Sequence, residues 1–220
     1  MKILTKLQLN FLKAFFRTHL KTDFFLTGGT ALAEFYLKHR LSEDIDLFTI
    51  NQEVNFTQVN AEIIKIINFL QAKIKHQVLT PSFIQYILQK NDSFLKIDVV
   101  KDTLPHFGKI KKIGEIQVDS LENISVGKLL ALFGRADAKD FIDLYFILKV
   151  EKKFTFEKIF NLAKKKDRGL EEFYLADMMT KVRQIKYFPK TLKPIDQKDL
   201  VNFYLELSKK IFNKIKPKED

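Results

Sequence analysis

The segment that decides the fold reads Phe24-Phe25-Leu26-Thr27-Gly28-Gly29-Thr30-Ala31-Leu32, and thirteen residues separate Thr30 from Asp44-Ile45-Asp46-Leu47-Phe48. The apolar run over 24–27 predicts a short buried strand that the two glycines end. The spacing after Thr30 predicts a helix over 31–38, and residues 44–48 predict a second strand. A strand, a glycine turn, a helix and a strand in this order indicate an α+β chain.

The glycine turn suits phosphate binding. Gly28 and Gly29 have no Cβ atom, so their backbone can approach phosphate oxygens closely. The helix that follows adds the partial positive charge of its first N–H groups, and Thr30 adds a hydroxyl. A tight turn with a purely structural purpose is the alternative interpretation, and the turn alone does not decide between them.

Asp44 and Asp46 lie two residues apart on the predicted strand, so their side chains leave the same face. Two carboxylates beside such a turn are suited to one or two Mg²⁺ ions, which prefer oxygen ligands. The alternative is the solvent face of an edge strand, where such pairs are common.

Asp98 is a lone acid in the apolar run 94–100. Leu95, Ile97 and Val99 share one face of the predicted strand, and Lys96 and Asp98 share the other. A carboxylate in an apolar strand is costly without a cation or a hydrogen-bonding partner. Asp98 is therefore a candidate third metal ligand facing Asp44 and Asp46, unless this face is simply hydrated.

The rest of the chain divides into a mixed part and a helical part. Residues 1–120 are expected to form the α+β core and residues 121–220 a helical domain, because strand patterns end near Ser120. The core is also expected to contain a long helix over 56–75, a short strand at 78–79, strands over 83–88 and 94–100 joined by a turn at 91–93, and a short strand at 116–118. Helices are expected over 126–133, 141–148, 154–163, 170–185 and 200–215.

Composition excludes several classes of protein. The 220 residues include no Cys, which rules out disulfide scaffolds, Cys–zinc sites and Cys nucleophiles. The sequence has neither an apolar run long enough for a bilayer nor a secretion signal, so we expect a cytoplasmic protein without membrane contact. The net charge is +11, and residues 151–220, with 18 basic and 11 acidic side chains, contribute +7 of it. This excess suggests a polyanion such as RNA as a partner, although a soluble surface would also explain it.

Taken together, the glycine turn, the Asp44-x-Asp46 strand and the later Asp98 resemble the nucleotidyltransferase superfamily that includes DNA polymerase beta. The segments Thr27-Gly28-Gly29-Thr30-Ala31-Leu32 and His39-Arg40-x-Ser42-x-Asp44-Ile45-Asp46-Leu47-Phe48 resemble the AbiEii/AbiGii toxin family more specifically. That family also has a downstream Lys, then an Arg, then Asp-x-x-Asp-Leu, matched here by Lys128, Arg135 and Asp140-Phe141-Ile142-Asp143-Leu144. Lys139 stands where the family often has Arg, which keeps the charge but not the planar contacts.

The resemblance implies a polymerase-beta-like nucleotidyltransferase core, a mixed sheet flanked by helices, followed by a helical bundle. It implies Asp44, Asp46 and Asp98 as magnesium ligands. The expected catalytic residues are these three acids together with Lys128 and Asp143. The nucleotide triphosphate would contact the following residues: Gly28, Gly29, Thr30, Arg40, Lys128, Arg135 and Asp140. Asp143 or Asp140 would complete the site, and the sequence does not say which. Structural roles are the alternatives: Arg40 could pair with Asp44, Asp140 could cap a helix, and Asp143 could pair with Arg135.

The family resemblance implies a Mg²⁺-dependent transfer of a nucleoside monophosphate to an acceptor, with tRNA as an example, by the toxin of a type IV toxin–antitoxin or phage-defence (abortive infection) system. A cognate antitoxin is the implied protein partner. Two alternatives stay open: the acceptor is a protein or a small molecule such as an aminoglycoside, or the chain is an inactive relative that binds nucleic acid or protein.

Overall fold

A computed structural model describes residues 3–150 and 154–215 of the chain. The chain divides into two compact units, Met1–Leu121 and Glu122–Asp220. The first contains the whole sheet and the second contains helices, so the fold is α+β. None of the helices in the described residues is both long and apolar enough to cross a membrane.

The first unit is built on a mixed seven-stranded sheet in the order β3-β4-β5-β2-β1-β7-β6. Its strands are β1 (Phe25–Thr27), β2 (Ile45–Thr49), β3 (Lys73–Leu79), β4 (Phe83–Lys90), β5 (Ser93–Lys101), β6 (Lys111–Ile113) and β7 (Ile116–Val118). Its helical segments are α1 (Lys6–Phe15), η1 (His19–Thr22), α2 (Gly28–Ala31), the π-helical η2 (Leu32–Leu37) and α3 (Phe56–Phe69). The helix predicted over 31–38 is thus split between α2 and a π-helical turn, a conformation that is frequent at functional sites.

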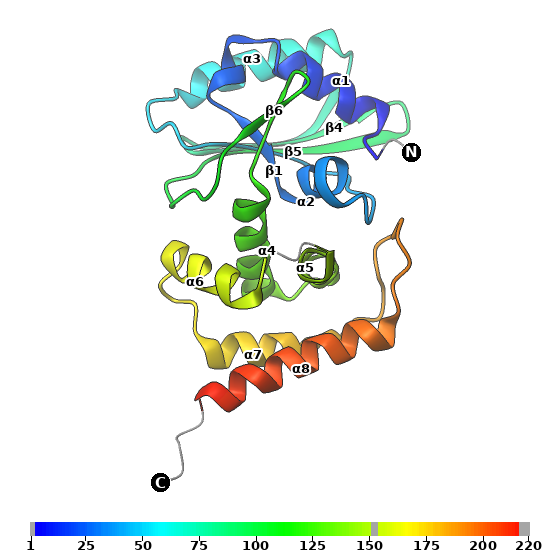
Figure 1. Cartoon of the computed structure of the whole chain (residues 1–220). Helices are drawn as coiled ribbons and strands as arrows, with labels where there is room; N and C mark the ends of the chain where they lie inside the picture. Colours follow the sequence, from blue (N-terminus) through cyan, green and yellow to red (C-terminus); the bar gives the residue numbers. More distant parts are fainter. Residues whose placement is uncertain (1–2, 151–153, 216–220) are drawn as a thin grey trace. The chain divides into compact units, whose positions relative to one another are not determined.

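The two faces of the sheet have different surroundings. Helices α1 and α3 cover one face, and α2 lies on the other (Figure 1). In β2 and β5 buried and half-buried residues alternate, and the buried set includes Ile45 and Ile97. Tyr86, the cross-strand partner of Ile97, donates its hydroxyl proton to Asn60 of α3. The buried set therefore faces α3, and Asp46 and Asp98 face the opposite side.

Phenylalanines fill the core beneath α1. The Phe15 ring is fully buried and lies 6.2 Å from Phe11, 5.4 Å from Phe16 and 5.6 Å from Phe24, measured between centroids. Burial of large aromatic rings supplies much of the stabilisation of a core of this size.

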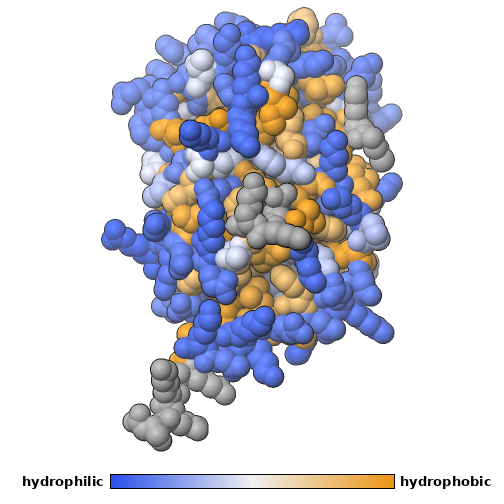
Figure 2. Space-filling model, in the orientation of Figure 1, coloured by the Kyte–Doolittle hydropathy of each residue, from blue (hydrophilic) through white to orange (hydrophobic). Residues whose placement is uncertain are grey.

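The second unit is helical. It contains α4 (Leu121–Arg135), α5 (Ala138–Val150), α6 (Phe156–Lys166), α7 (Glu172–Thr180), η3 (Lys181–Gln184) and α8 (Gln197–Ile215). Helix α8 packs on α7 and α5: Ser208 donates to the carbonyl of Ala176 at 2.8 Å, and Tyr204 donates to that of Phe141 at 2.6 Å. Hydrophilic side chains cover most of the face of α7 and α8 that is visible in Figure 2.

Several predicted boundaries were wrong. The helix expected over 56–75 ends at Phe69, because Gln71 has φ +54° and Lys73 begins β3. The strand β6 was not predicted, and the helix expected over 170–185 is divided between α7 and η3. The turn between β4 and β5 was predicted, and Asn91 has the left-handed φ of +51° that such a turn favours.

Phe15→Ala is expected to lower the free energy of unfolding of the first unit by about 3–5 kcal/mol, because it leaves a cavity among the three rings that pack on Phe15. Phe69→Ala is the matched control, since the Phe69 side chain is 79% exposed and its loss should change stability by no more than about 0.5 kcal/mol. Urea denaturation followed by circular dichroism measures both. Equal losses for the two variants would contradict this description of the core.

Candidate active site

One row of side chains crosses the sheet on the face opposite α3. The antiparallel pairing of β1 and β2 brings Thr27 opposite Asp46. The parallel pairing of β2 and β5 brings Asp46 opposite Asp98, and the pairing of β5 with β4 brings Asp98 opposite Gln85. Directly opposed residues point to the same face. The sheet therefore brings together two carboxylates that are 52 positions apart in the sequence.

A second pair of charges lies beside this row. Asp44 precedes β2 by one residue, and continuing the β2–β5 register beyond Ile45 and Ile97 puts it opposite Lys96. Three carboxylates and one ammonium thus form a group that we call the charged square: Asp44, Asp46, Lys96 and Asp98.

Lys96 and Gln85 hold the carboxylate of Asp98. Lys96 Nζ lies 2.7 Å from Asp98 Oδ2, and Gln85 Nε2 donates to Asp98 Oδ1 at 2.8 Å. Burial alone would lower the pKa of the Lys96 ammonium, but the hydrogen bond and charge of Asp98, with the charges of Asp44 and Asp46, outweigh burial and raise the pKa. Lys96 therefore stays protonated at neutral pH.

The first glycine of the turn lies against the carboxylate of Asp46. A Cβ atom on Gly28 would be 2.1 Å from Asp46 Oδ2. Gly28 also has φ +68°, in the left-handed region that disfavours side chains. The sequence suggested close approach of a phosphate as the reason for this glycine, and the structure adds close approach of Asp46.

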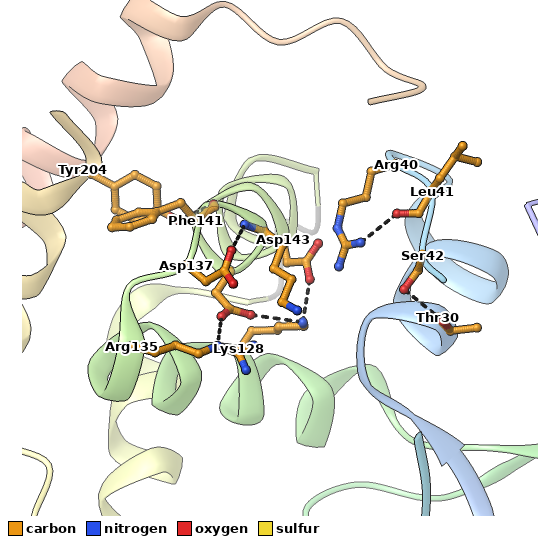
Figure 3. Close-up of polar contacts among 12 residues, drawn as sticks. Thr30, Arg40, Leu41, Ser42, Lys128, Arg135, Asp137, Phe141, Asp143 and Tyr204 are labelled. Atoms are coloured by element: carbon orange, nitrogen blue, oxygen red, sulfur yellow. Dashed lines mark hydrogen bonds and ion pairs between the residues drawn. The ribbon is translucent and has the colours of Figure 1, made fainter. Parts of the chain in front are cut away.

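The second glycine makes room for a buried guanidinium. A Cβ atom on Gly29 would be 2.6 Å from Arg40 Nη2. Arg40 is only 4% exposed, and its Nη1 donates to the carbonyl of Leu41 at 2.8 Å (Figure 3). Arg40 is therefore a fixed positive charge next to the glycine turn.

Thr30 holds the loop that leads into β2. Its fully buried hydroxyl donates to the backbone carbonyl of Asp44 and shares a hydrogen bond of 2.9 Å with Ser42 Oγ (Figure 3). Gln8 of α1 donates to the carbonyl of Ser42 at 2.9 Å. These contacts position Asp44, and a direct contact of Thr30 with phosphate stays a prediction.

The other end of the row is anchored by a buried acid that sequence reasoning missed. Asp119 is fully buried and accepts hydrogen bonds from Thr27 Oγ1 at 2.5 Å and from the backbone N–H of Ser120 at 2.7 Å. Its Oδ1 lies 2.8 Å from His106 Nε2. Tyr36 donates to the Asp119 carbonyl at 2.6 Å, and burial, followed by the charge of Asp119, raises the pKa of Tyr36 to about 12. This network fixes the strand end from which the glycine turn begins.

The second unit has its own buried ion network. Lys128 Nζ of α4 lies 2.6 Å from Asp143 Oδ2 and 3.3 Å from Asp140 Oδ1 of α5, and Arg135 Nε lies 2.7 Å from Asp140 Oδ2 (Figure 3). Both aspartates are fully buried. All four residues that the sequence singled out downstream are therefore brought together, and each carboxylate has at least one cation beside it.

One detail of this network differs from the structural alternatives that the sequence left open. Asp140 does not cap α5 with its side chain, because that side chain pairs with Lys128 and Arg135; instead Asp137 Oδ1 accepts from the N–H of Lys139 at 3.2 Å. Burial, followed by the charges of Asp143 and Asp140, raises the pKa of Tyr204 well above its ordinary value. Its phenol therefore stays neutral against α5.

The acids of the first unit have the ligand atoms that a hard divalent cation prefers. Carboxylate oxygens are the donors that Mg²⁺ prefers, and Asp44 and Asp46 are held beside Asp98. Within residues 3–150 and 154–215, however, no three acidic or histidine side chains already converge as a metal-binding cluster. Lys96 occupies one oxygen of Asp98. The donor set fits the metal, provided that this ammonium gives way.

Comparisons with known proteins identify the family of the chain. The family model described as "Nucleotidyl transferase AbiEii toxin, Type IV TA system" matches residues 10–207. An uncharacterized protein of Aquifex aeolicus (strain VF5) is 25% identical over 203 residues, covering 88% of this chain and 87% of that protein.

Solved structures of similar fold include two from Helicobacter pylori. One, described as a candidate nucleotidyltransferase, has a TM-score of 0.62 at 19% identity and covers 96% of this chain and 93% of its own. JHP933 has a TM-score of 0.58 at 21% identity, with coverage of 96% and 90%. MenT4, a nucleotidyltransferase toxin from Mycobacterium tuberculosis H37Rv, has a TM-score of 0.58 at 12% identity, with coverage of 91% and 82%. At these identities, the likeness shows the fold.

Gly28→Ala is expected to destabilise the first unit by at least about 1–2 kcal/mol, the cost of a left-handed alanine, and to displace the Asp46 carboxylate. Gly134→Ala is the matched control: Gly134 lies in α4 with nothing within 4 Å of its added Cβ, so a gain of up to about 1 kcal/mol is expected there. Urea denaturation measures both. A Gly28→Ala protein as stable as the wild type would show that the turn does not need glycine.

Lys128→Met is expected to lower the free energy of unfolding by about 3–5 kcal/mol, because it removes a cation that pairs with two fully buried carboxylates. Lys158→Met is the control, since Lys158 pairs with Glu122 at 2.7 Å on the surface and should cost no more than about 1 kcal/mol. A Lys128→Met protein of unchanged stability would mean that Lys128 has no structural role and is reserved for ligand contact. Thermal and urea denaturation of the two proteins decide between these outcomes.

Proposed function

Since the chain belongs to the AbiEii family of nucleotidyltransferase toxins from type IV toxin–antitoxin systems, we propose that it transfers a nucleoside monophosphate from a nucleotide triphosphate to an RNA acceptor and releases pyrophosphate. The enzyme class follows from the family. The acceptor, the metal and the roles of single residues are the proposal.

One observation carries the assignment of the site: Asp46 is in register with Asp98 and its carboxylate lies against Gly28. A phosphate held by the glycine turn would therefore meet an anion at close range. A divalent cation between two anions offsets their repulsion, so the geometry supports a metal-assisted phosphoryl transfer.

Asp44, Asp46 and Asp98 would hold Mg²⁺, which in such reactions neutralises charge on the phosphates and polarises the reacting oxygens. Asp44 and Asp46 would hold the metal ion in a fixed position, because contacts of Thr30 and the β2 backbone fix these two residues. Asp98 accepts the proton of the acceptor hydroxyl. That hydroxyl oxygen forms a bond to the α-phosphorus while the bond from the α-phosphorus to the pyrophosphate oxygen breaks.

The glycine turn and the cations hold the nucleotide. In this proposal the backbone N–H groups of Gly28 and Gly29, with Thr30, bind the β- and γ-phosphates, and Arg40 adds a fixed charge next to them. In the second unit, Lys128 contacts the triphosphate, as the family resemblance implies. Asp143 and Asp140 orient its ammonium, and Arg135 holds Asp140 in place.

A basic segment of the second unit supports RNA as the acceptor. Between Met178 and Ile195 the chain has five cations and no acid: Lys181, Arg183, Lys186, Lys190 and Lys193. Among the described residues, 3–150 and 154–215, none of the five cations has an ion-pair partner. Tyr187 lies among them with 87% of its surface exposed. Unpaired cations around an exposed aromatic ring are the features that bind single-stranded RNA, through phosphate contacts and base stacking.

The reaction also fits the remaining parts of the proposal. We propose the cytoplasm as the compartment, because nucleotide triphosphate and RNA, the substrates of the proposed reaction, are both present there. The family supports a cognate antitoxin as the protein partner, and tRNA is the specific acceptor that we favour.

Incubation of the protein with each α-labelled nucleotide triphosphate, Mg²⁺ and total tRNA tests the proposal. Label is expected in RNA with one preferred nucleotide. Asp46→Asn should reduce the rate at least about a hundredfold, because a lost metal-holding charge removes a few kcal/mol of transition-state stabilisation. The transfer should weaken with salt, as phosphate contacts do.

Other outcomes of this experiment would change the proposal. Label in a protein or in a small molecule would keep the transferase and replace the acceptor. Asp46-dependent binding of nucleotide without any transfer would leave the site in place with an unidentified acceptor. If the nucleotide did not bind at all, the chain would be an inactive relative that binds other macromolecules.

A further inference from the structure

Lys96 is the one cation of the charged square, and it lies where the square is most acidic. Its Nζ is 2.7 Å from Asp98 Oδ2, and the charges of Asp44 and Asp46 also attract it. Without Lys96, three carboxylates would face one another on a half-buried sheet surface, and each would repel the others. The ammonium therefore does the neutralising that a divalent cation would do.

A divalent cation bound to Asp98 Oδ2 would share that oxygen with the Lys96 ammonium and would lie within a few ångströms of it. Each also raises the electrostatic cost of the other, since two positive charges within a few ångströms repel. Binding of a cation to the three acids must therefore separate Lys96 from Asp98 or proceed against its charge.

Lys96 is able to leave. Its side chain is 38% exposed, whereas that of Lys128 in the buried ion network is 9% exposed. Lysine has a flexible four-carbon stem and a strongly hydrated head group. Asp98 would keep its second hydrogen bond of 2.8 Å from Gln85 during the exchange. Lys96 therefore has the properties of a replaceable counterion, which Lys128 lacks.

We propose that Lys96 is a built-in counterion of the metal site, which neutralises Asp98 in the metal-free protein and is displaced when a divalent cation binds. Lys96 thereby lowers the cation affinity of the site while keeping the metal-free site folded. The inference rests on the proposed function, because it takes the three aspartates as the metal-holding residues.

Titration with Mn²⁺ alone, followed by calorimetry and by thermal denaturation, tests this without any measurement of activity. The wild type is compared with Lys96→Met. Lys112→Met, which removes an exposed lysine of β6, controls for net charge. Gln85→Leu removes the other hydrogen bond to Asp98 without removing a charge, and Asp46→Asn removes a metal-holding acid.

Lys96→Met is expected to bind Mn²⁺ about tenfold more tightly than the wild type, which corresponds to about 1.4 kcal/mol. In EDTA it should melt at a lower temperature than the wild type, and Mn²⁺ should raise its melting temperature by more. Lys112→Met and Gln85→Leu should show no such gain. If Lys96→Met does not fold in EDTA, Lys96→Gln, which also lacks the charge, carries the same expectation.

Two results would overturn the inference. The first is Mn²⁺ binding by the Lys96 variants that is no tighter than binding by the wild type. The second is an equal gain in Lys112→Met, which would make the effect one of overall charge. The proposed metal site fails separately, if Mn²⁺ binds neither the wild type nor the Lys96 variants, or binds Asp46→Asn as well as the wild type.

Discussion

The parallel pairing of β2 with β5 is the constraint on which the rest of the site depends. This register puts Asp46 beside Asp98, and it also sends Ile45 and Ile97 to the face covered by α3. A slip of one residue would bury the acids and expose the apolar set, because side chains alternate along a strand. The apolar core therefore fixes the register, and the register creates the acidic face.

Placing carboxylates together has an electrostatic cost that the surrounding residues reduce. Lys96 neutralises Asp98 on one side, and Gln85 donates a hydrogen bond to it on the other. Asp46 reaches the glycine turn only because Gly28 has no Cβ atom. The acids and the turn are thus one structural unit. Under the proposed function, an anionic substrate would approach these acids with a cation between them, because like charges repel.

In the first unit the acids lie on a half-buried face, whereas in the second unit the acids of the ion network are buried and paired with cations. Its aspartates at 140 and 143 are fully buried, and Lys128 lies within hydrogen-bonding distance of Asp143. A buried pair of this kind is costly to break, because removal of one partner leaves the other desolvated. Functional and structural interpretations of Lys128 are therefore compatible. An ammonium that is oriented by buried acids stabilises the helices, and the same orientation would prepare it for the phosphate contact that the proposed function assigns to it.

The sequence by itself determined the α+β class, the strand–turn–helix order around Gly28 and the shared face of Asp44 and Asp46, because these follow from local periodicity and from glycine chemistry. It also predicted that Lys96 shares a face with Asp98. The end of α3 at Phe69 could not be predicted from local patterns, because the apolar spacing continues past it and only the left-handed backbone of Gln71 ends the helix. Only the tertiary structure decided that Asp98 is opposite Asp46, and that Asp119 anchors Thr27, because strand pairing joins residues that no local pattern connects.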